Sequence, residues 1–325
     1  MTGVLGGDGS LVSRYAAVVC DLDGVVYRGP AAVPGAVDAL RAIEVPVLYA
    51  TNNASRPPEE VAAHLRELGL PCVPDAVATS SQAGAWLLSD RVAPGSAVLA
   101  VGGAGVALAL TEAGLRPVAP DDAATAGPLV AVLQGYGPQV RATDLAEAAY
   151  AVQGGAWWVA TNTDTTLPTD RGVAPGNGSL VGAVANAVGR APDVVAGKPG
   201  PPLYLLCAAR LGLEPAAVLA VGDRLDTDIE GAVAAGIDSL LVLTGVDDLQ
   251  ACLDAPAHRR PTWVAPDLSA LHAPLSTDAG DGGVLADLTA AVAAVHAATD
   301  AGAEPGRVAR LVEAAHSVLA RVAHR

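Results

Sequence analysis

Short apolar runs alternate with stretches of helical spacing along most of the chain. Runs of four to seven apolar residues are typical of strands covered on both faces, and they predict strands at 16–20, 45–50, 97–101, 129–133, 157–161, 217–221 and 239–243. Apolar positions three or four apart predict helices at 34–43, 57–68, 81–88, 143–152, 179–188 and 201–211, with others that end at 113 and 235. This alternation predicts an α/β fold with a doubly wound parallel sheet.

The same pattern divides the chain into domains. Residues 82–180 have strands and helices of their own, so we expect a compact α/β domain inserted between two parts of a core, 1–81 and 181–272. From 273 to 325 the composition shifts to Ala, Gly and Asp, and helical spacing at 285–298 and 307–322 predicts an α-hairpin on the core or on a partner. The Gly-rich first residues are expected to be disordered.

Composition and charge exclude several classes of partner. The net charge is -15, which argues against nucleic acid and against anionic membrane surfaces. No apolar run reaches the roughly 18 residues of a membrane span, and the start does not resemble a secretory signal. Four scattered cysteines are typical of reduced thiols and predict a cytoplasmic protein. A homodimer is conceivable through the inserted domain or the helical tail.

Polar residues gather where several predicted strands end. Asp21 and Asp23 follow the first strand and precede Gly24, an arrangement that a solvated Asp-Gly turn would also explain. Thr51, Asn52 and Asn53 follow the second strand. Asp223, Asp226 and Asp228 follow the strand at 217–221, and the single lysine among nineteen basic residues, Lys198, precedes that strand. Carboxyl ends of parallel strands share one edge, so these groups are expected to converge.

Together the groups supply what phosphoryl transfer to a carboxylate needs. Asp21 is the candidate nucleophile and Asp23 the candidate general acid and base. We expect Mg²⁺ to be held by Asp21, Asp223 and the backbone carbonyl of Asp23, because hard cations prefer oxygen ligands.

The remaining polar residues are expected to serve the metal and the phosphate. Asp228 would orient the waters on the metal. Phosphate oxygens would be bound by Gly24, Thr51, Asn52, Asn53 and Lys198, and the lysine charge would also favour the nucleophile.

Four segments carry a resemblance to a known family. DLDGVVYRG, TNNAS, GKP and GDRLDTDI, in this order, resemble the motifs of the haloacid-dehalogenase-like superfamily of phosphatases, over residues 15–270. The inserted domain, with TNTDTTLPTDRGVAPGNGSL, resembles the NagD and 4-nitrophenylphosphatase branch, and within it the actinobacterial glycerol 3-phosphate phosphatases. The resemblance implies a Rossmann-like core, an α/β cap over residues 82–180 and a small-molecule phosphate ester as substrate. It makes Asn162 and Asp164 candidate substrate contacts, although an ordered turn of the cap would also explain them.

Other functions stay open at this point. The ester could be phosphoglycolate, pyridoxal phosphate or a nucleotide instead of glycerol 3-phosphate. A dehalogenase would need no proton donor such as Asp23, and a non-catalytic metabolite-binding protein would need no acid–base pair. A glycine-rich segment at 102–105 resembles a dinucleotide fingerprint, but Leu108 replaces its third glycine, which favours a tight strand-to-helix turn.

Overall fold

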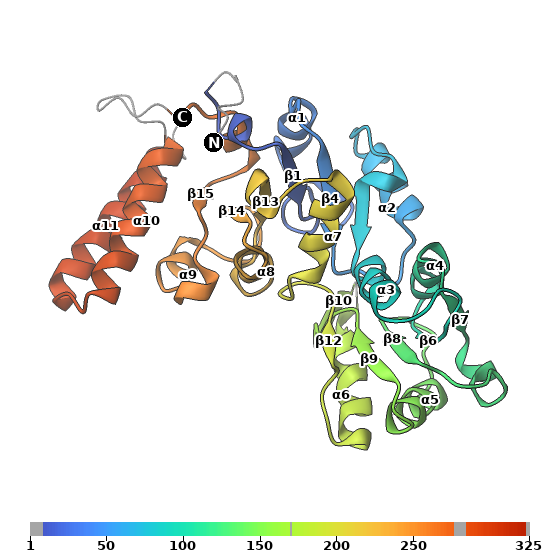
Figure 1. The fold of residues 1–325 in the computed structure, drawn as a ribbon. Coiled ribbons are helices and arrows are strands. Elements are labelled where there is room, and N and C mark those ends of the chain that lie inside the picture. Colours follow the sequence, from blue (N-terminus) through green and yellow to red (C-terminus); the bar gives the residue numbers. More distant parts are fainter. Residues whose placement is uncertain (1–8, 170, 276–283, 323–325) are drawn as a thin grey trace. The chain divides into compact units, whose positions relative to one another are not determined.

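The protein is described by a computed structural model that covers residues 9–169, 171–275 and 284–322 (Figure 1). Residues 1–8, part of the start expected to be disordered, lie outside the described residues. Contacts divide the chain into two compact units, which are described separately. The first comprises 1–49, 65–71 and 208–325, and the second comprises 50–64 and 72–207.

The first unit is built on a parallel sheet. Its strands lie in the order β15-β14-β13-β1-β4, with bounds β1 Ala17–Cys20, β4 Val47–Thr51, β13 Val218–Gly222, β14 Asp238–Val242 and β15 Trp263–Ala265. Cys20 at the end of β1 pairs with Tyr49 of β4 and with Val221 of β13, so β1 lies between them. Every residue of β1 and β13 is buried, as their apolar runs predict.

Helices and short turns surround this sheet. The helices within the first unit are α1 Ala36–Arg41, α8 Glu230–Ala235, α9 Leu249–Leu253, α10 Val284–Asp300 and α11 Pro305–Val322. A small hairpin, β2 Tyr27–Arg28 and β3 Ala31–Ala32, follows the Asp-Gly segment. Single turns of helix occur at η1 Val12–Arg14, η4 Pro215–Ala217, η5 Leu225–Ile229, η6 Ala257–Arg259 and η7 Leu268–His272. Two helices, α2 Pro58–Glu67 and α7 Pro202–Leu211, begin in the second unit and end in the first.

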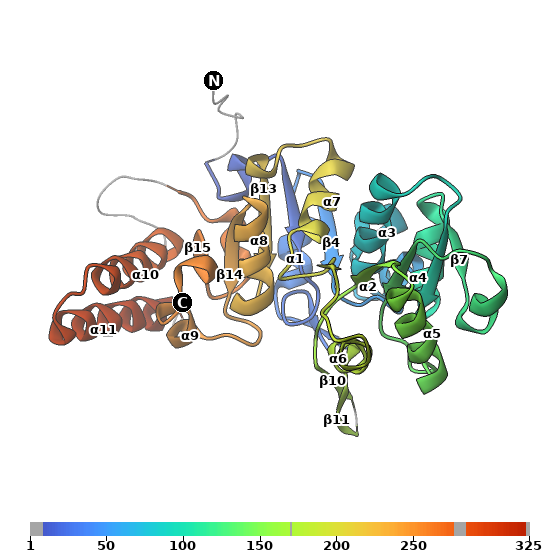
Figure 2. The same cartoon turned by 60° about the horizontal axis from the view of Figure 1, so that its bottom comes forward.

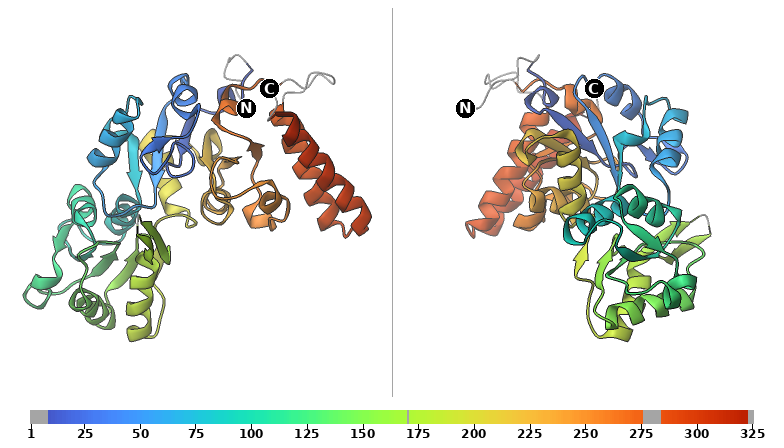
Figure 3. Two further views of the ribbon diagram at one scale, coloured as in Figure 1. Left: turned by 180° about the vertical axis from the view of Figure 1, so that it is seen from behind. Right: turned by 45° about the vertical axis from the view of Figure 1, so that its right-hand side comes forward.

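The tail forms the predicted α-hairpin, and it packs on the core of its own unit. Helices α10 and α11 run side by side in every view (Figure 2; Figure 3). Leu288, Val292 and Val295 of α10 join a buried cluster with Leu253 of α9 and Val264 of β15. The imidazole Nε2 of His296 lies 2.8 Å from the carbonyl oxygen of Cys252, and Arg260 forms an ion pair with Asp300. The hairpin therefore extends the hydrophobic core of the first unit.

The second unit contains a parallel sheet of its own, in the order β12-β9-β8-β6-β7. Its elements along the chain are η2 Pro74–Ala76, β5 Val77–Thr79, α3 Ser80–Arg91, β6 Ala97–Val101, α4 Ala104–Glu112, β7 Arg116–Val118, η3 Pro120–Thr125, β8 Ala131–Gln134, α5 Ala142–Gln153, β9 Trp157–Ala160, α6 Asn177–Val188 and β12 Val194–Val195. Trp158 is fully buried in its core, where its indole N–H donates to the side chain of Gln134. The fold class is therefore α/β, as predicted.

The structure gives the conformation of two segments of the second unit that the sequence pattern leaves open. The segment after β9, for which the apolar pattern predicts no strand, contains an antiparallel hairpin, β10 Thr166–Thr169 and β11 Gly172–Pro175. The glycine-rich segment is the expected tight turn, because a side chain at Gly103 or Gly105 would collide with the backbone of residues 54–56. The N–H of Gly105, at the start of α4, donates to the carbonyl of Ser55. The first turn of this helix is therefore in contact with the protein's own backbone. Across the described ranges, no helix combines the length and the apolar character that a membrane crossing requires.

Candidate active site

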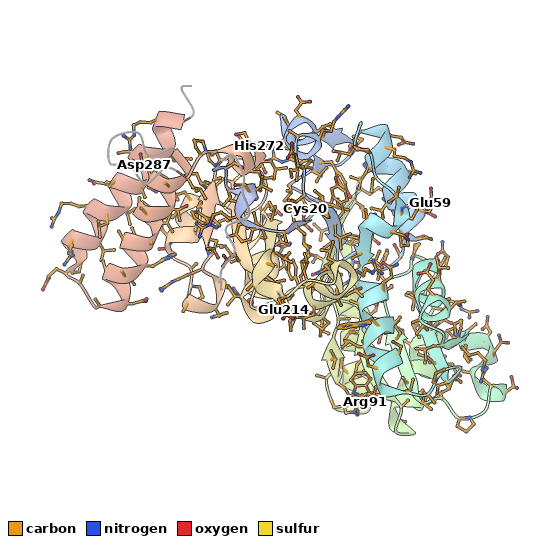
Figure 4. All side chains as sticks on the ribbon, turned by 45° about the horizontal axis from the view of Figure 1, so that its top comes forward. Cys20, Glu59, Arg91, Glu214, His272 and Asp287 are labelled. Carbon is orange, nitrogen blue, oxygen red and sulfur yellow. The ribbon has the colours of Figure 1, made fainter. Side chains whose placement is uncertain are left out.

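Three carboxylates of the first unit meet beside the carboxyl ends of β1 and β13. Asp21, Asp223 and Asp228 each place a carboxylate oxygen within 4.8 Å of the others. Asp21 follows Cys20, which Figure 4 labels, and its N–H donates to the carbonyl of Val221 at 2.8 Å. That bond continues the β1–β13 pairing by one residue. The register of two adjacent strands therefore brings Asp21 near Asp223.

Backbone amides hold the two buried carboxylates. Asp223 and Asp228 are 1% and 2% exposed. One oxygen of Asp228 accepts from the N–H groups of Asp223, at 3.2 Å, and Arg224, at 3.1 Å. The turn η5 after β13 has π-helical hydrogen bonding, a feature often found at functional sites, and it returns the chain so that Asp228 can make these contacts. The N–H of Val246 donates to Asp223 Oδ2 at 2.8 Å.

Two glycines leave room for Asp223. Gly24 has φ of 85°, a left-handed conformation that favours glycine, and a side chain there would overlap the Asp223 carboxylate. A side chain at Gly245 would overlap the same carboxylate. The neighbouring Thr244 donates its hydroxyl hydrogen to the carbonyl of Gly24 at 2.8 Å. The segment 244–246 therefore fixes both Asp223 and the turn after β1.

Asp23 occupies a different position from the three clustered carboxylates. It is exposed, in a turn where the carbonyl of Leu22 accepts from the N–H groups of Val25, Val26 and Tyr27. The N–H of Gly24 donates to the carbonyl of Tyr27 at 2.8 Å. The turn therefore leaves the Asp23 residue exposed.

The donor set of the cluster fits Mg²⁺. It offers carboxylate oxygens alone, the ligands that hard divalent cations prefer, with no histidine or cysteine that would favour zinc. Two of the three groups are buried, so their mutual repulsion is costly unless a cation lies among them. The glycines at 24 and 245 keep side chains out of this space. Magnesium is the cofactor that these residues suit.

The second unit brings together four other predicted site residues. The side chain of Asn52 makes two hydrogen bonds with the main chain of Lys198, and the Lys198 ammonium donates to the carbonyl of Ala50 at 3.3 Å. Asn162 donates to the carbonyl of Asn52 at 2.8 Å, and its own Oδ1 accepts from the N–H of Asp164 at 3.2 Å. Lys198 is 3% exposed, which is rare for a lysine and shows that it is not a surface residue.

Thr51 and Asn53 build the turn after β4. The hydroxyl of Thr51 accepts from the N–H of Asn53 at 3.1 Å, and the side-chain oxygen of Asn53 accepts from the N–H and the hydroxyl of Ser55. Thr51 is buried, whereas Asn53 is exposed. These contacts fix the turn.

The sequence did not point to Thr244, Gly245 or Val246. A Thr-Gly pair at a strand end is common and carries no charge, so it gives no chemical signal by itself. Their contribution comes from packing against Asp223 and Gly24, residues more than twenty positions away along the chain.

An Asp-x-Asp segment and a magnesium-type carboxylate cluster at the strand ends of a parallel α/β fold suit a phosphoryl-transfer enzyme. A haloacid dehalogenase-like hydrolase model matches residues 18–116, and a second model of HAD-hydrolase-like proteins matches 195–271. The D-glycerol 3-phosphate phosphatase of Mycobacterium tuberculosis is 47% identical over 268 residues, which are 81% of this chain and 72% of the relative.

Solved structures agree with this relationship. The crystal structure of glycerol phosphate phosphatase from M. tuberculosis in complex with magnesium superimposes with a TM-score of 0.76 at 46% identity, over 81% of this chain and 78% of that one. NagD from E. coli K-12 has a TM-score of 0.70 at 29% identity, over 78% and 97%. The chain belongs to the haloacid dehalogenase-like hydrolases, and it is a phosphatase.

Proposed function

We propose that the protein is a Mg²⁺-dependent phosphatase of a small phosphate ester, with glycerol 3-phosphate as its substrate. The observation that carries the proposal is the carboxylate cluster of Asp21, Asp223 and Asp228, whose oxygens lie within 4.8 Å of one another beside the carboxyl ends of β1 and β13. A buried cluster of this kind needs a divalent cation, and Asp21, which is only half-buried, keeps access to a substrate.

The reaction proceeds in two steps through an aspartyl-phosphate. A carboxylate oxygen of Asp21 attacks phosphorus, the bond from phosphorus to the ester oxygen breaks, and Asp23 gives its proton to the leaving alcohol. Water then attacks the phosphorus of phospho-Asp21, Asp23 accepts a proton from that water, and the bond from phosphorus to Asp21 breaks. Inorganic phosphate leaves, and both aspartates return to their starting states.

Asp223 and Asp21 would hold the metal, with the backbone carbonyl of Asp23, and Asp228 would orient waters beside it. Mg²⁺ would neutralise charge on the phosphoryl group and on the clustered carboxylates. Asp228 also orders the turn that carries Asp223, through the two N–H groups that its carboxylate accepts. These assignments account for why two aspartates stay buried beside each other.

Lys198, Thr51 and Asn53 provide donors for the phosphoryl oxygens, and Gly24 lets backbone N–H groups approach them. Support for Lys198 comes from its attachment to the end of β4, where its ammonium donates to the carbonyl of Ala50. A buried lysine in a chain that otherwise uses arginine fits a compact, fixed positive charge. Its charge would stabilise the transferring phosphoryl group.

The substrate assignment rests on the relatives and on the inserted domain. The relative at 47% identity is a D-glycerol 3-phosphate phosphatase, and the shared length includes the segment with Asn162 and Asp164. We propose that residues 82–180 form a cap domain, that 1–81 and 181–272 form the core, and that 273–325 is an extension. Within the cap, Asn162 and Asp164 contact the glycerol part of the substrate.

We also propose a cytoplasmic location, with no nucleic-acid or membrane partner. The four cysteines are buried thiols that form no disulfide, as in proteins of reducing compartments, and the charge of -15 opposes binding to polyanions. A homodimer is the assembly to test, by light scattering of the purified protein.

Hydrolysis assays on purified variants test the proposal. Asp21→Asn should lower kcat for glycerol 3-phosphate at least about 10⁴-fold, because the nucleophile is lost with little change of shape. Asp38→Asn, which changes an exposed aspartate of α1 in the same way, should retain activity. An Asp21→Asn enzyme with wild-type turnover contradicts the mechanism. A panel with phosphoglycolate, pyridoxal phosphate and nucleotides tests the substrate, which is wrong if glycerol 3-phosphate ranks far below another ester in kcat/KM.

A further inference from the structure

The side chain of Asn52 makes an unusually complete set of contacts for a residue expected to bind phosphate. Its Oδ1 accepts from the N–H of Lys198 at 2.8 Å, and its Nδ2 donates to the carbonyl of Lys198 at 2.9 Å. This two-point pairing resembles that of two peptide groups in a β-ladder. The second Nδ2 hydrogen faces a carboxylate oxygen of Asp164 at 3.5 Å, the outer limit of a hydrogen bond.

The surroundings keep Asn52 and the Lys198 segment in this arrangement. The carbonyl of Asn52 accepts from both Asn162 and Ser80, each at 2.8 Å. The N–H of Gly197 donates to the carbonyl of Thr161 at 2.7 Å. A side chain at Gly197 would approach Asn52 Oδ1 to 2.5 Å, so only glycine lets the two segments lie this close.

The ammonium group of Lys198 is fixed by the same stretch of chain. It donates to the carbonyl of Ala50 at 3.3 Å, two residues before Asn52. Residues 50 and 52 therefore hold the lysine at both ends, one through the ammonium and the other through the main chain. A lysine side chain has several rotatable bonds, and anchoring both ends reduces the conformations that the ammonium can adopt.

We propose that Asn52 is a positioning residue, which acts in the reaction by fixing Lys198 and does not itself bind the phosphoryl group. The proposal rests on the role given to Lys198 under the proposed function and replaces the sequence-based expectation for Asn52. One Nδ2 hydrogen of Asn52 donates to the Lys198 carbonyl and the other faces Asp164, so neither is directed at a phosphate while these contacts hold. Loss of the two hydrogen bonds between the Asn52 side chain and the Lys198 main chain would displace the ammonium. Misplacement by about 1 Å can cost about 10²-fold in rate.

A double-mutant cycle tests this role. Asn52→Ala, Lys198→Ala and the double variant are compared with the wild type by kcat and KM for glycerol 3-phosphate at saturating Mg²⁺. Asn52→Ala should lower kcat by up to about 10²-fold, and Lys198→Ala should lower it at least as much. If Asn52 acts only through Lys198, the double variant will have the kcat of Lys198→Ala, because a residue cannot position a side chain that is absent.

Two further variants sharpen the experiment. Ser80→Ala removes a hydrogen bond to the Asn52 carbonyl, which keeps Asn162 as a donor, so this matched control should stay within about threefold of wild-type kcat. Asn52→Asp keeps the shape and the accepting oxygen but puts a second oxygen against the Lys198 carbonyl. It should lose activity like Asn52→Ala, and it serves if the alanine variant does not fold.

The outcomes separate this proposal from the proposed function. If Lys198→Ala is impaired and the rate losses of the two single variants multiply in the double variant, Asn52 acts independently of Lys198. That result would overturn the positioning role alone. A folded Asn52→Asp enzyme with wild-type kcat would overturn it as well. If Lys198→Ala retains wild-type activity, the role of Lys198 in the proposed function fails, and the positioning role fails with it.

Discussion

Replacing Gly245 by alanine should weaken Mg²⁺ binding. The glycine backbone is not in the left-handed region, so alanine brings no conformational strain, and the whole effect comes from the added methyl group. That methyl would overlap the carboxylate of Asp223, whose Oδ2 is held by the N–H of Val246 at 2.8 Å. Either the carboxylate or the segment that holds it must move.

The size of the effect follows from the burial of Asp223. Only 1% of this residue is exposed, so the carboxylate has no open space on the solvent side into which it could rotate. Changes to groups that orient metal ligands typically reduce metal affinity about 10- to 100-fold, equivalent to about 1.4–2.7 kcal/mol. The overpacked methyl should also lower the free energy of unfolding by about 1–3 kcal/mol.

The assay is a Mg²⁺ titration of the rate of 4-nitrophenyl phosphate hydrolysis, with calorimetry of metal binding and a thermal melt of each variant. Gly182→Ala is the matched control, because a side chain on this α6 glycine meets nothing within 4 Å. It should leave the Mg²⁺ dependence unchanged and raise stability by up to about 1 kcal/mol. A folded Gly245→Ala enzyme with the wild-type Mg²⁺ dependence would refute the reasoning.

Three other changes have defined outcomes. Asp23→Asn should reduce kcat/KM for glycerol 3-phosphate by about 10²–10⁴-fold. The loss of kcat/KM for 4-nitrophenyl phosphate should be far smaller, because nitrophenolate leaves without a proton. Equal losses for the two substrates would argue against an acid role. Leu288→Ala should lower the free energy of unfolding by about 2–5 kcal/mol, seen by urea denaturation, with Mg²⁺ dependence unchanged; a near-neutral result would mean that α10 does not belong to the core. Burial lowers the pKa of His296, helped by Arg260 and opposed by the Cys252 carbonyl and Asp300, so its protonation favours the unfolded chain. The contribution of neutral His296 to the stability of the fold is complete above about pH 6.5 and is lost as pH falls. On acidification, Tm should therefore drop less steeply in His296→Gln than in the wild type.

The architecture could be predicted because buried parallel strands leave a clear signal. The apolar runs before Asp21 and Asp223 became β1 and β13 within one residue at each end. The strands β7 and β15 were missed, since three residues containing proline, arginine or tryptophan do not form a recognisable run. The apolar pattern gives no signal for the hairpin β10–β11, because its threonines suit a strand and a polar turn alike.

The site could be predicted only where the chemistry lies in the residue type. Aspartates after a strand and a single lysine carry their own signal, so the sequence could single out Asp21, Asp223 and Lys198 as candidates. The sequence could not predict that Gly245 makes room for a carboxylate, because the role of a glycine depends on what packs against it. Asn52 suited a phosphate donor by type, and only its two hydrogen bonds to the Lys198 main chain suggested the different role proposed above.

The most direct test of the account is to identify the residue that carries phosphate during turnover. Enzyme mixed with Mg²⁺ and excess glycerol 3-phosphate is quenched in acid within milliseconds, digested, and mapped by mass spectrometry. The account predicts phosphate on Asp21 in the wild type and no phosphopeptide in Asp21→Asn. Steady turnover with phosphate on another residue would contradict it.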